Sequence, residues 1–173
     1  REVAPSGAYR DMFLDDSMNV IPGESWHTSR ASGVPGSVAG FGVAHEKYGS
    51  VKWKSLVKPA AELAKNGFPL DFQNWTTLNL PYYQEYLSYD SEAKKIFIKG
   101  DDFKLKITDS EAPNIPSGMS IGETGRYEVH QHLLHELFVQ KDLGKTLQRI
   151  ANTGWQEFYK GKTADLIEKC MKR

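Results

Sequence analysis

Three histidines lie close together in the second half of the chain, at His130, His132 and His135. If this stretch is helical, His132 and His135 share a face, because residues three apart are neighbours on a helix surface. Imidazole nitrogens together with a carboxylate from Glu128 or Glu136 could ligate a divalent metal. A catalytic zinc helix, however, carries H-E-x-x-H, which this stretch lacks. We therefore interpret the cluster as the solvated edge of an amphipathic helix and predict no metal site.

No residue has the sequence surroundings of a catalytic nucleophile. Ser37 follows Gly36 at an expected helix start, but the G-x-S-x-G elbow of hydrolases is missing. Cys170 lies in a predicted amphipathic C-terminal helix with no histidine nearby in sequence. The glycines between Gly33 and Gly42 do not have the spacing of a phosphate-binding loop. The residues themselves thus predict neither a complete catalytic apparatus nor a cofactor.

The composition is that of an ordinary globular domain. The chain has 173 residues, of which 39% are hydrophobic and 25% charged, which argues against disorder, a collagen-like repeat or a coiled coil. Its 22 Lys and Arg balance its 22 Asp and Glu, so no net field attracts nucleic acid. No stretch approaches the roughly 18 apolar residues that span a bilayer. We expect neither a nucleic-acid partner nor a membrane span.

The elements that must position these residues are predicted to be mostly helical. Apolar residues recur at helical spacing along much of the chain. Within the second of these helices, Gly40 and Gly42 would each cost about 1 kcal/mol relative to Ala unless another backbone packs close to them, so we interpret them as close-packing positions. The expected helices are 8–13, 38–48 with Ser37 as N-cap and Gly49 as stop, 53–66, pieces within 71–89 broken at Pro81, 129–138, 143–152 and 164–171.

Strands are expected only in the middle of the chain. Residues 95–98 and 103–107 have strand-like composition on either side of Gly100-Asp101, which predicts a small hairpin. Residues 108–127 hold Gly and Pro among Ser, Thr, Asn and Asp, and predict an irregular excursion. No repeat or low-complexity linker divides the chain, which we expect to form one core or a piece of one.

Two features bear on where the chain comes from. It begins at Arg1 rather than at methionine, and we expect a cut there, with any signal peptide outside these residues. The single cysteine cannot form an internal disulfide, so cysteine usage leaves the redox compartment open.

Several segments, in order, resemble the large subunit of γ-glutamyltransferase, also called γ-glutamyl transpeptidase or glutathione hydrolase. The resemblance covers roughly residues 1–68 and 141–172 and is weak between them. It suggests that 1–173 is a single segment of that large subunit. The matching segments are Arg1-Glu-Val-Ala-Pro5, Met12-Phe13, Ser32-Gly-Val-Pro-Gly-Ser-Val-Ala-Gly40, His45-Glu-Lys-Tyr-Gly49, Lys58-Pro-Ala-Ala-Glu-Leu-Ala64, Asn66-Gly-Phe68, Lys145-Thr-Leu-Gln-Arg-Ile-Ala151, Gly154 and Glu157-Phe-Tyr-Lys-Gly161.

The resemblance implies an N-terminal-nucleophile hydrolase, an α+β fold with an αββα sandwich, of which this chain would be a predominantly α segment with a small hairpin. In that family a small subunit, released by autoproteolysis, begins with the catalytic threonine, and no such segment lies in these 173 residues. The complete enzyme would cleave the γ-glutamyl amide of glutathione or its conjugates and pass the acyl group to water, amino acids or peptides. The family's usual location implies a periplasmic, cell-surface or secreted protein.

One residue carries over from the resemblance as a site residue. Arg1 matches the arginine of the R-E-x-A-P motif, which holds the α-carboxylate of the γ-glutamyl donor, and its planar guanidinium suits a planar carboxylate. No catalytic residue and no metal ligand carries over, and the chain alone is expected to be inactive. Two alternatives stay open: a related acylase or poly-γ-glutamate-processing enzyme, and a non-catalytic helical binding module, with or without a metal bound through His130, His132 and His135.

Overall fold

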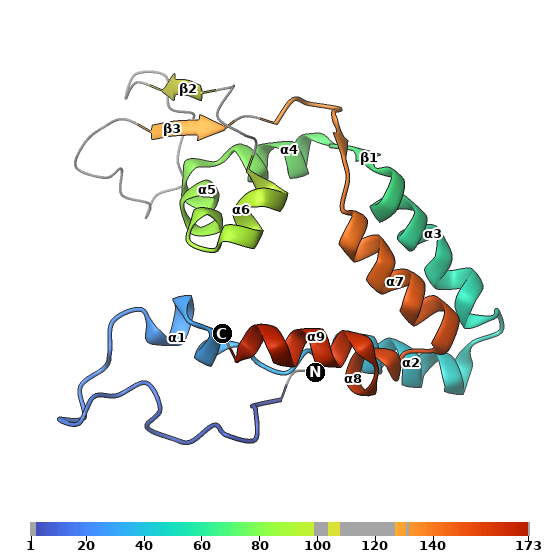
Figure 1. Cartoon of the computed structure of the whole chain (residues 1–173), viewed down its shortest axis with the longest axis horizontal. Helices are drawn as coiled ribbons and strands as arrows, with labels where there is room; N and C mark the ends of the chain where they lie inside the picture. Colours follow the sequence, from blue (N-terminus) through green and yellow to red (C-terminus); the bar gives the residue numbers. More distant parts are fainter. Residues whose placement is uncertain (1–2, 99–103, 108–126, 131, 173) are drawn as a thin grey trace. The chain divides into compact units, whose positions relative to one another are not determined.

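The computed structural model describes residues 3–98, 104–107, 127–130 and 132–172 (Figure 1). It is mostly helical, as predicted, and the chain divides into two compact units. Unit 1 comprises Arg1–Glu62 and Asp142–Arg173, and unit 2 comprises Leu63–Lys141. No helix among the described residues is both long and apolar enough to cross a membrane.

Unit 1 is built from helices contributed by both ends of the chain. Two of them extend past its limits, because α3 continues into unit 2 and α7 begins at the last residue of unit 2. The elements are α1 (Glu24–His27), the short 3-10 helix η1 (Ser29–Ala31), α2 (Ser37–Tyr48), α3 (Trp53–Asn66), α7 (Lys141–Thr153), α8 (Glu157–Lys160) and α9 (Lys162–Met171).

In its described residues, unit 2 combines three short helices with two small antiparallel sheets. Strand β1 pairs with β4, and β2 pairs with β3. The helices α4, α5 and α6 follow one another directly along the chain (Figure 1). The elements are β1 (Phe68–Pro69), α4 (Phe72–Asn79), α5 (Pro81–Ser88), α6 (Ser91–Phe97), β2 (Lys104–Ile107), β3 (Tyr127–His130) and β4 (Leu137–Phe138).

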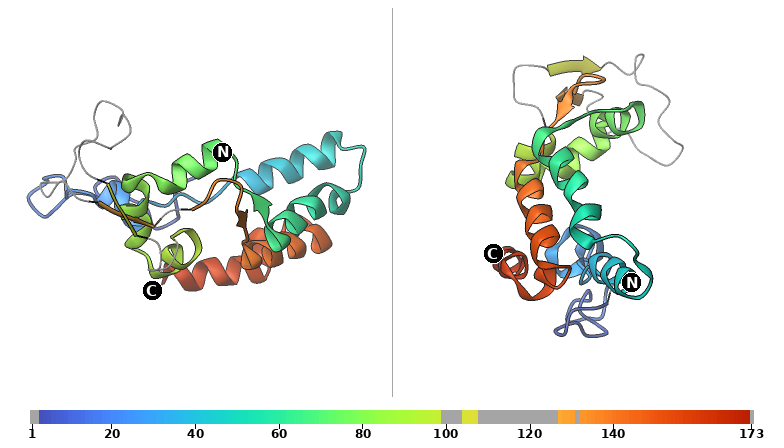
Figure 2. Two further views of the ribbon diagram at one scale, coloured as in Figure 1. Left: turned by 90° about the horizontal axis from the view of Figure 1, so that it is seen from above. Right: turned by 90° about the vertical axis from the view of Figure 1, so that its right-hand side faces the viewer.

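Helix α3 has the limits that the sequence predicted, and in unit 1 its beginning lies against the end of α7. The indole N–H of Trp53 donates to the carbonyl oxygen of Ile150, at 2.9 Å. Ile150 and Ala151 are buried on the inner face of α7, and Figure 2 shows the two helices side by side from two further directions. Helix α3 ends at Asn66 because Gly67 follows with a φ of 89°, a left-handed conformation that glycine adopts without strain.

Helix α2 is held close to the segment that follows α7. Gly42 is buried, and a Cβ at this position would lie 2.1 Å from Cγ of Trp155. The indole ring thus fills the space of the missing side chain, and the prediction of a close-packing glycine is confirmed at this position. It is wrong for Gly40, where a Cβ would meet nothing within 4 Å.

The start of α2 also differs from the prediction. Gly36, rather than Ser37, is the N-cap residue, and no side chain at the cap bonds to the helix. The predicted stop is confirmed, since Tyr48 is the last helical residue and the N–H of Gly49 bonds to the carbonyl oxygen of His45 at 2.7 Å.

The helix predicted over 8–13 does not form; most of this segment is turns. Asp15 draws the following residues into a tight loop, because its Oδ1 accepts hydrogen bonds from the N–H groups of Ser17 (2.9 Å) and Asn19 (2.8 Å). Leu14 and Val20 then pair as an isolated antiparallel bridge. Within the predicted helix, the N–H of Met12 bonds to the carbonyl oxygen of Tyr9 at 3.3 Å, three residues earlier, as in a turn.

The hairpin predicted around residues 100–101 is also wrong, because 91–97 form α6. Asp90 is its N-cap, and its Oδ1 accepts from the N–H groups of Glu92 (3.0 Å) and Ala93 (2.7 Å), so a cap outweighs the strand-like composition that follows. Strand β2 lies within the predicted 103–107 but pairs with β3, Lys104 facing His130. The excursion predicted over 108–127 lies outside the described residues except for Tyr127, the first residue of β3.

The helix predicted over 129–138 is replaced by the end of β3, a turn and β4. Phe138 is buried and pairs with Phe68, while Leu137 is exposed, so the strand alternates between a buried and an exposed face. Leu70, which is 1% exposed, bonds through its N–H to Glu136 and through its carbonyl oxygen to the N–H of His135. Local apolar spacing predicted a helix, whereas pairing with distant residues produces a strand.

The two glycines of α2 provide a matched test of this packing. We expect Gly42→Ala to lower the free energy of unfolding by about 1–3 kcal/mol, because the added methyl group overlaps the Trp155 ring. We expect Gly40→Ala to raise it by about 0.5–1 kcal/mol, because alanine favours a helix and meets no neighbour. Denaturant unfolding measures both, and equal stability of the two variants would contradict the packing described here.

Candidate functional site

The turn before α2 pairs with the N-terminal segment. The N–H of Val34 donates to the carbonyl oxygen of Val3 at 2.9 Å, and the two residues form an isolated antiparallel bridge. Arg1, the predicted substrate-binding residue, lies outside the described residues, two positions before Val3 in the sequence. The structure therefore describes the pairing of Val3, and the role of Arg1 stays a prediction.

Tyr159 in α8 ties the same turn to the first turn of α2. Its hydroxyl donates to the carbonyl oxygen of Pro35 at 2.6 Å and accepts from the N–H of Ala39 at 3.0 Å. A tyrosine hydroxyl has one proton to donate, so its donor capacity is used here and it also serves as an acceptor. One side chain thus joins the turn, the helix and a segment more than a hundred residues away.

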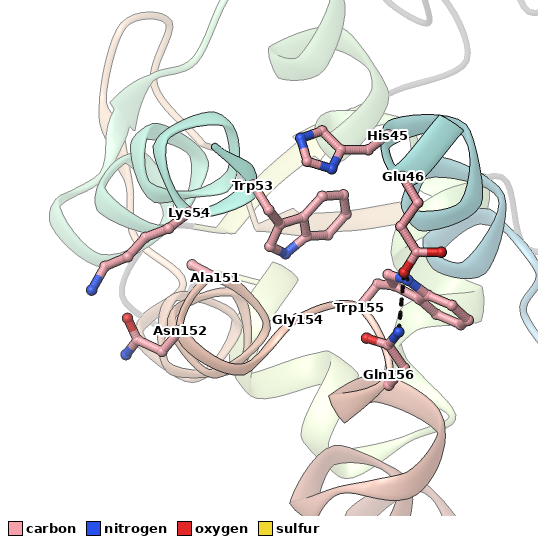
Figure 3. Close-up of a pocket in the computed structure, with 9 residues that line it drawn as sticks. All are labelled: His45, Glu46, Trp53, Lys54, Ala151, Asn152, Gly154, Trp155 and Gln156. Carbon is pink, nitrogen blue, oxygen red and sulfur yellow. Dashed lines mark hydrogen bonds between the residues drawn. The ribbon is translucent and has the colours of Figure 1, made fainter. Parts of the chain in front are cut away.

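Next to this contact, Glu46 of α2 binds two side chains beyond α7. Its Oε1 accepts from the indole N–H of Trp155 at 2.7 Å and from the amide of Gln156 at 3.2 Å. Figure 3 shows the carboxylate of Glu46 pointing toward both residues. These bonds fix the indole that packs against Gly42.

An open pocket of about 300 Å³ lies beside Glu46, within unit 1 (Figure 3). His45 and Trp53 both line the pocket, and their rings pack edge to face with centroids 5.3 Å apart. His45 Nε2 donates to the carbonyl oxygen of Val51 at 2.6 Å, so its ring serves packing, and Lys54 stands at the rim. The pocket offers aromatic surface and one carboxylate, but no group placed for nucleophilic attack.

A buried ion pair holds α8 and α9 in unit 1. The carboxylate of Glu157, 8% exposed, accepts from Arg149 Nε at 3.3 Å and from the N–H and hydroxyl of Thr163 at 3.1 and 2.6 Å. Because Thr163 lies in the first turn of α9, Glu157 supplies the cap that Gly161 cannot. Arg149 also donates to the hydroxyls of Thr146 and Thr163. The network fixes the short helix that carries Tyr159.

Arg30 holds the N-terminal loop of unit 1. Its guanidinium donates to the carbonyl oxygen of Met12 and to the hydroxyl of Tyr9 (3.4 Å), and lies 3.5 Å from Oε2 of Glu24. Further along the loop, the backbone N–H of Asn19 lowers the pKa of Asp15 below its ordinary value, with smaller contributions from the side chain of Asn19 and the N–H of Ser17. The loop is therefore held by one cation and one anion with specific backbone partners.

The histidine cluster is not on a helix, and its central member is buried within unit 2. His132 Nδ1 lies 2.5 Å from Oε1 of Glu136, and its Nε2 lies 2.9 Å from the carbonyl oxygen of Phe97, which can only accept. Asn79 bonds to both backbone groups of His132. Both ring nitrogens are thus already engaged by protein groups.

Of the other two histidines in the cluster, the structure describes the side chain of His135 alone. His135 is exposed in the turn, with a φ of 66°, and the side chain of His130 lies outside the described part of the chain. Among the described residues, no group of three His, Cys, Asp or Glu side chains could hold a metal ion. Cys170 is a free, exposed residue of α9.

Sequence reasoning missed the residues that organise this part of unit 1. Tyr159 and Trp155 bond to residues more than a hundred positions earlier, and such pairs leave no local pattern. The partners of Glu157 are near in sequence, but no motif marks them. Gly42 gave the one usable indication, since a glycine within a helix indicates a close neighbour without identifying it.

Comparisons with known proteins identify relatives over almost the whole chain. The family model described as Gamma-glutamyltranspeptidase matches residues 1–114. The chain is 35% identical to the glutathione hydrolase proenzyme of Pseudomonas aeruginosa, covering 96% of this chain and 24% of that protein, and 36% identical to that of Escherichia coli, covering 100% and 25%. The chain thus spans about a quarter of the length of the curated relatives it matches.

A solved structure agrees with these matches. The crystal structure of Helicobacter pylori gamma-glutamyltranspeptidase superimposes with a TM-score of 0.78 at 36% sequence identity, covering 99% of this chain and 41% of that chain. The similarity therefore extends to the arrangement of the elements as well as to the motifs.

The ion pair between Arg149 and Glu157 provides a test of what holds α8. We expect Glu157→Ala to lower the free energy of unfolding by about 2–4 kcal/mol, because it removes a buried charge pair and the cap of α9. As a control, Glu168→Ala removes an exposed carboxylate of α9 that pairs with Lys172, and should leave the unfolding midpoint nearly unchanged. If the two variants unfold at the same denaturant concentration, the network does not hold α8.

A second test concerns the buried histidine. We expect His132→Ala to lower the free energy of unfolding by about 1–3 kcal/mol, because both bonds of the ring are lost. His135→Gly should leave stability unchanged or raise it by about 1 kcal/mol, since glycine adopts a left-handed φ without strain. Thermal unfolding of both variants, with and without added Zn²⁺, separates a structural histidine from a metal ligand: stabilisation of the unmodified protein by Zn²⁺ would contradict the structural role.

Proposed function

The chain belongs to the γ-glutamyltranspeptidase family, and we propose that the complete protein cleaves γ-glutamyl amides, as in glutathione or its conjugates, and transfers the acyl group to water or an acceptor amine. The observation that carries this proposal is 36% identity, over the whole chain, to a protein named glutathione hydrolase proenzyme. Its support is sequence and fold similarity, since the described residues contain no nucleophile placed for attack.

In this proposal the reaction is divided between this chain and a small subunit. The threonine that begins the small subunit attacks the γ-carbonyl carbon through its hydroxyl oxygen, with its own α-amino group as base. The amide C–N bond breaks, the leaving amine takes up the proton, and an ester-linked acyl-enzyme forms. Water or an amine then attacks the ester and regenerates the threonine. We assign the αββα sandwich to the complete enzyme, with this chain as part of its helical layer.

The part of this chain in the reaction is recognition of the donor. We propose that Arg1 binds the α-carboxylate of the γ-glutamyl group, because a guanidinium donates two parallel hydrogen bonds to a carboxylate. This contact lies at the end of the donor away from the scissile amide, so it sets orientation and takes no part in the bond changes. The bridge between Val3 and Val34 supports the proposal, since it ties down the backbone just beyond Arg1.

We further propose an exported location, periplasmic, at the cell surface or secreted, on the basis of family membership alone. Fractionation of the source cells, with γ-glutamyl amide hydrolysis as the readout, tests it. Activity confined to the cytoplasm would contradict the proposal.

The first experiment combines denaturing mass spectrometry with an activity assay on the same purified material. We expect a second polypeptide with an N-terminal threonine to accompany this chain, and hydrolysis of γ-glutamyl-p-nitroanilide by the sample. Material that contains both polypeptides and does not hydrolyse the anilide would contradict the proposed function and favour a non-catalytic module.

In active material, Arg1→Ala should raise the KM for the γ-glutamyl donor by about tenfold or more, because a charge-assisted pair of bonds is lost. The matched control is Arg10→Ala, which removes an arginine whose side chain is 96% exposed. We expect the control to leave KM and kcat unchanged. Equal effects of the two substitutions would show that Arg1 has no special role in donor binding.

A further inference from the structure

We propose that Tyr159 is a positioning residue for donor binding, and that its hydroxyl holds the Val34-Pro35 turn with which Val3, two positions after Arg1 in the sequence, is paired. This inference rests on the proposed function, because it concerns the geometry of the proposed carboxylate site. It assigns a role to a side chain that the resemblance left without one.

The first step is the arrangement of bonds around the hydroxyl. Tyr159 donates to the carbonyl oxygen of Pro35 at 2.6 Å and accepts from the N–H of Ala39 at 3.0 Å. Its partners lie on either side of the N-cap residue, Gly36. The hydroxyl therefore fixes both the last carbonyl of the turn and the beginning of α2.

The second step is that α2 lacks a cap of its own. The first N–H groups of a helix have no partner within it, and Ser, Thr, Asp or Asn at the N-cap usually supplies one. Gly36 has no side chain to do this, and no side-chain cap bond is present at this end. The N–H of Ala39, the third helical residue, binds Tyr159 instead. The Tyr159 hydroxyl, from a distant part of the sequence, thus accepts a bond that an N-cap side chain would otherwise accept.

The third step leads from the turn to the N-terminal segment. Val34, directly before Pro35, donates its N–H to the carbonyl oxygen of Val3. Both valines are exposed, so little apolar burial supports this bridge, and its geometry depends on how well the turn is fixed. Only Glu2 separates Val3 from Arg1 in the sequence. We therefore expect a loosely fixed turn to weaken the binding of the donor carboxylate by Arg1.

The fourth step is that Tyr159 is itself rigidly held. Its ring packs edge to face against Phe158 and Trp155, with centroids 5.0 and 6.1 Å away. Trp155 is fixed in turn by Gly42 and Glu46. Because these contacts fix the ring of Tyr159, its hydroxyl can determine the position of the Val34-Pro35 turn.

The test is Tyr159→Phe in the active protein, which keeps the ring and removes only the hydroxyl. We expect the KM for γ-glutamyl-p-nitroanilide to rise about three- to tenfold, as the loss of one or two hydrogen bonds predicts, with kcat within about twofold of the unmodified protein. A merely structural role would lower the active fraction, and with it kcat, without changing KM.

The matched control is Tyr89→Phe. The hydroxyl of Tyr89 bonds to Glu85, 2.9 Å away and one helical turn earlier, so the same chemical deletion has only a local effect. We expect KM and kcat of this variant to be unchanged. Hydrogen exchange provides a second readout: the amides of Val34 and Ala39 should exchange faster in Tyr159→Phe and at the same rate in Tyr89→Phe.

The outcomes separate the two proposals. If the unmodified protein does not hydrolyse the anilide, the proposed function fails, and the role of Tyr159 fails with it. If the protein is active and Tyr159→Phe leaves KM unchanged, only the role of Tyr159 is overturned. A raised KM with unchanged exchange at Val34 and Ala39 would also overturn it, because the effect would not pass through the turn. A raised KM with faster exchange supports the proposal.

Discussion

The close approach of Trp155 to Gly42 is the constraint on which the rest of unit 1 depends. An indole ring sits where a side chain of α2 would be, so helix and ring can come together only if position 42 has no Cβ. Glu46, one helical turn further along α2, accepts a hydrogen bond from the indole N–H, which fixes the orientation of the ring as well as its distance from the helix. With Trp155 fixed, α8 begins at a defined place, and its Tyr159 bonds to the start of α2.

The same arrangement explains why a single proline-containing turn connects so many elements. The turn has little apolar surface of its own, and Val34 and Val3 are exposed. Its position comes instead from directional bonds, one along the backbone and one to a tyrosine. The network of Arg149, Glu157 and Thr163 also stabilises Tyr159, because it fixes α8, the helix that carries this tyrosine. The position of the turn is thus set by hydrogen bonds rather than by burial.

Local patterns predicted the elements whose ends are set locally. Helix α3 was predicted with its limits because an apolar stripe ends at Asn66-Gly67, and the break between α4 and α5 was predicted from Pro81. The failures have equally specific causes. Asp90 caps a segment of strand-like composition into α6, and Phe138 pairs with Phe68 and turns a helical pattern into a strand. Arg1 came from family resemblance, whereas no residue pattern could have paired Tyr159 with Pro35.

The division of the chain has a consequence for how it is made. Unit 2 is continuous from 63 to 141, whereas unit 1 takes its parts from both sides of it. Since a ribosome releases the N-terminal part first, α2 emerges long before its partners in α8 have been translated. Unit 2 has all its strands and helices available while the nascent chain still lacks the residue that fits against Gly42. Within this chain, helix α2 is therefore made before unit 2 but gains its partners only after unit 2 has been translated.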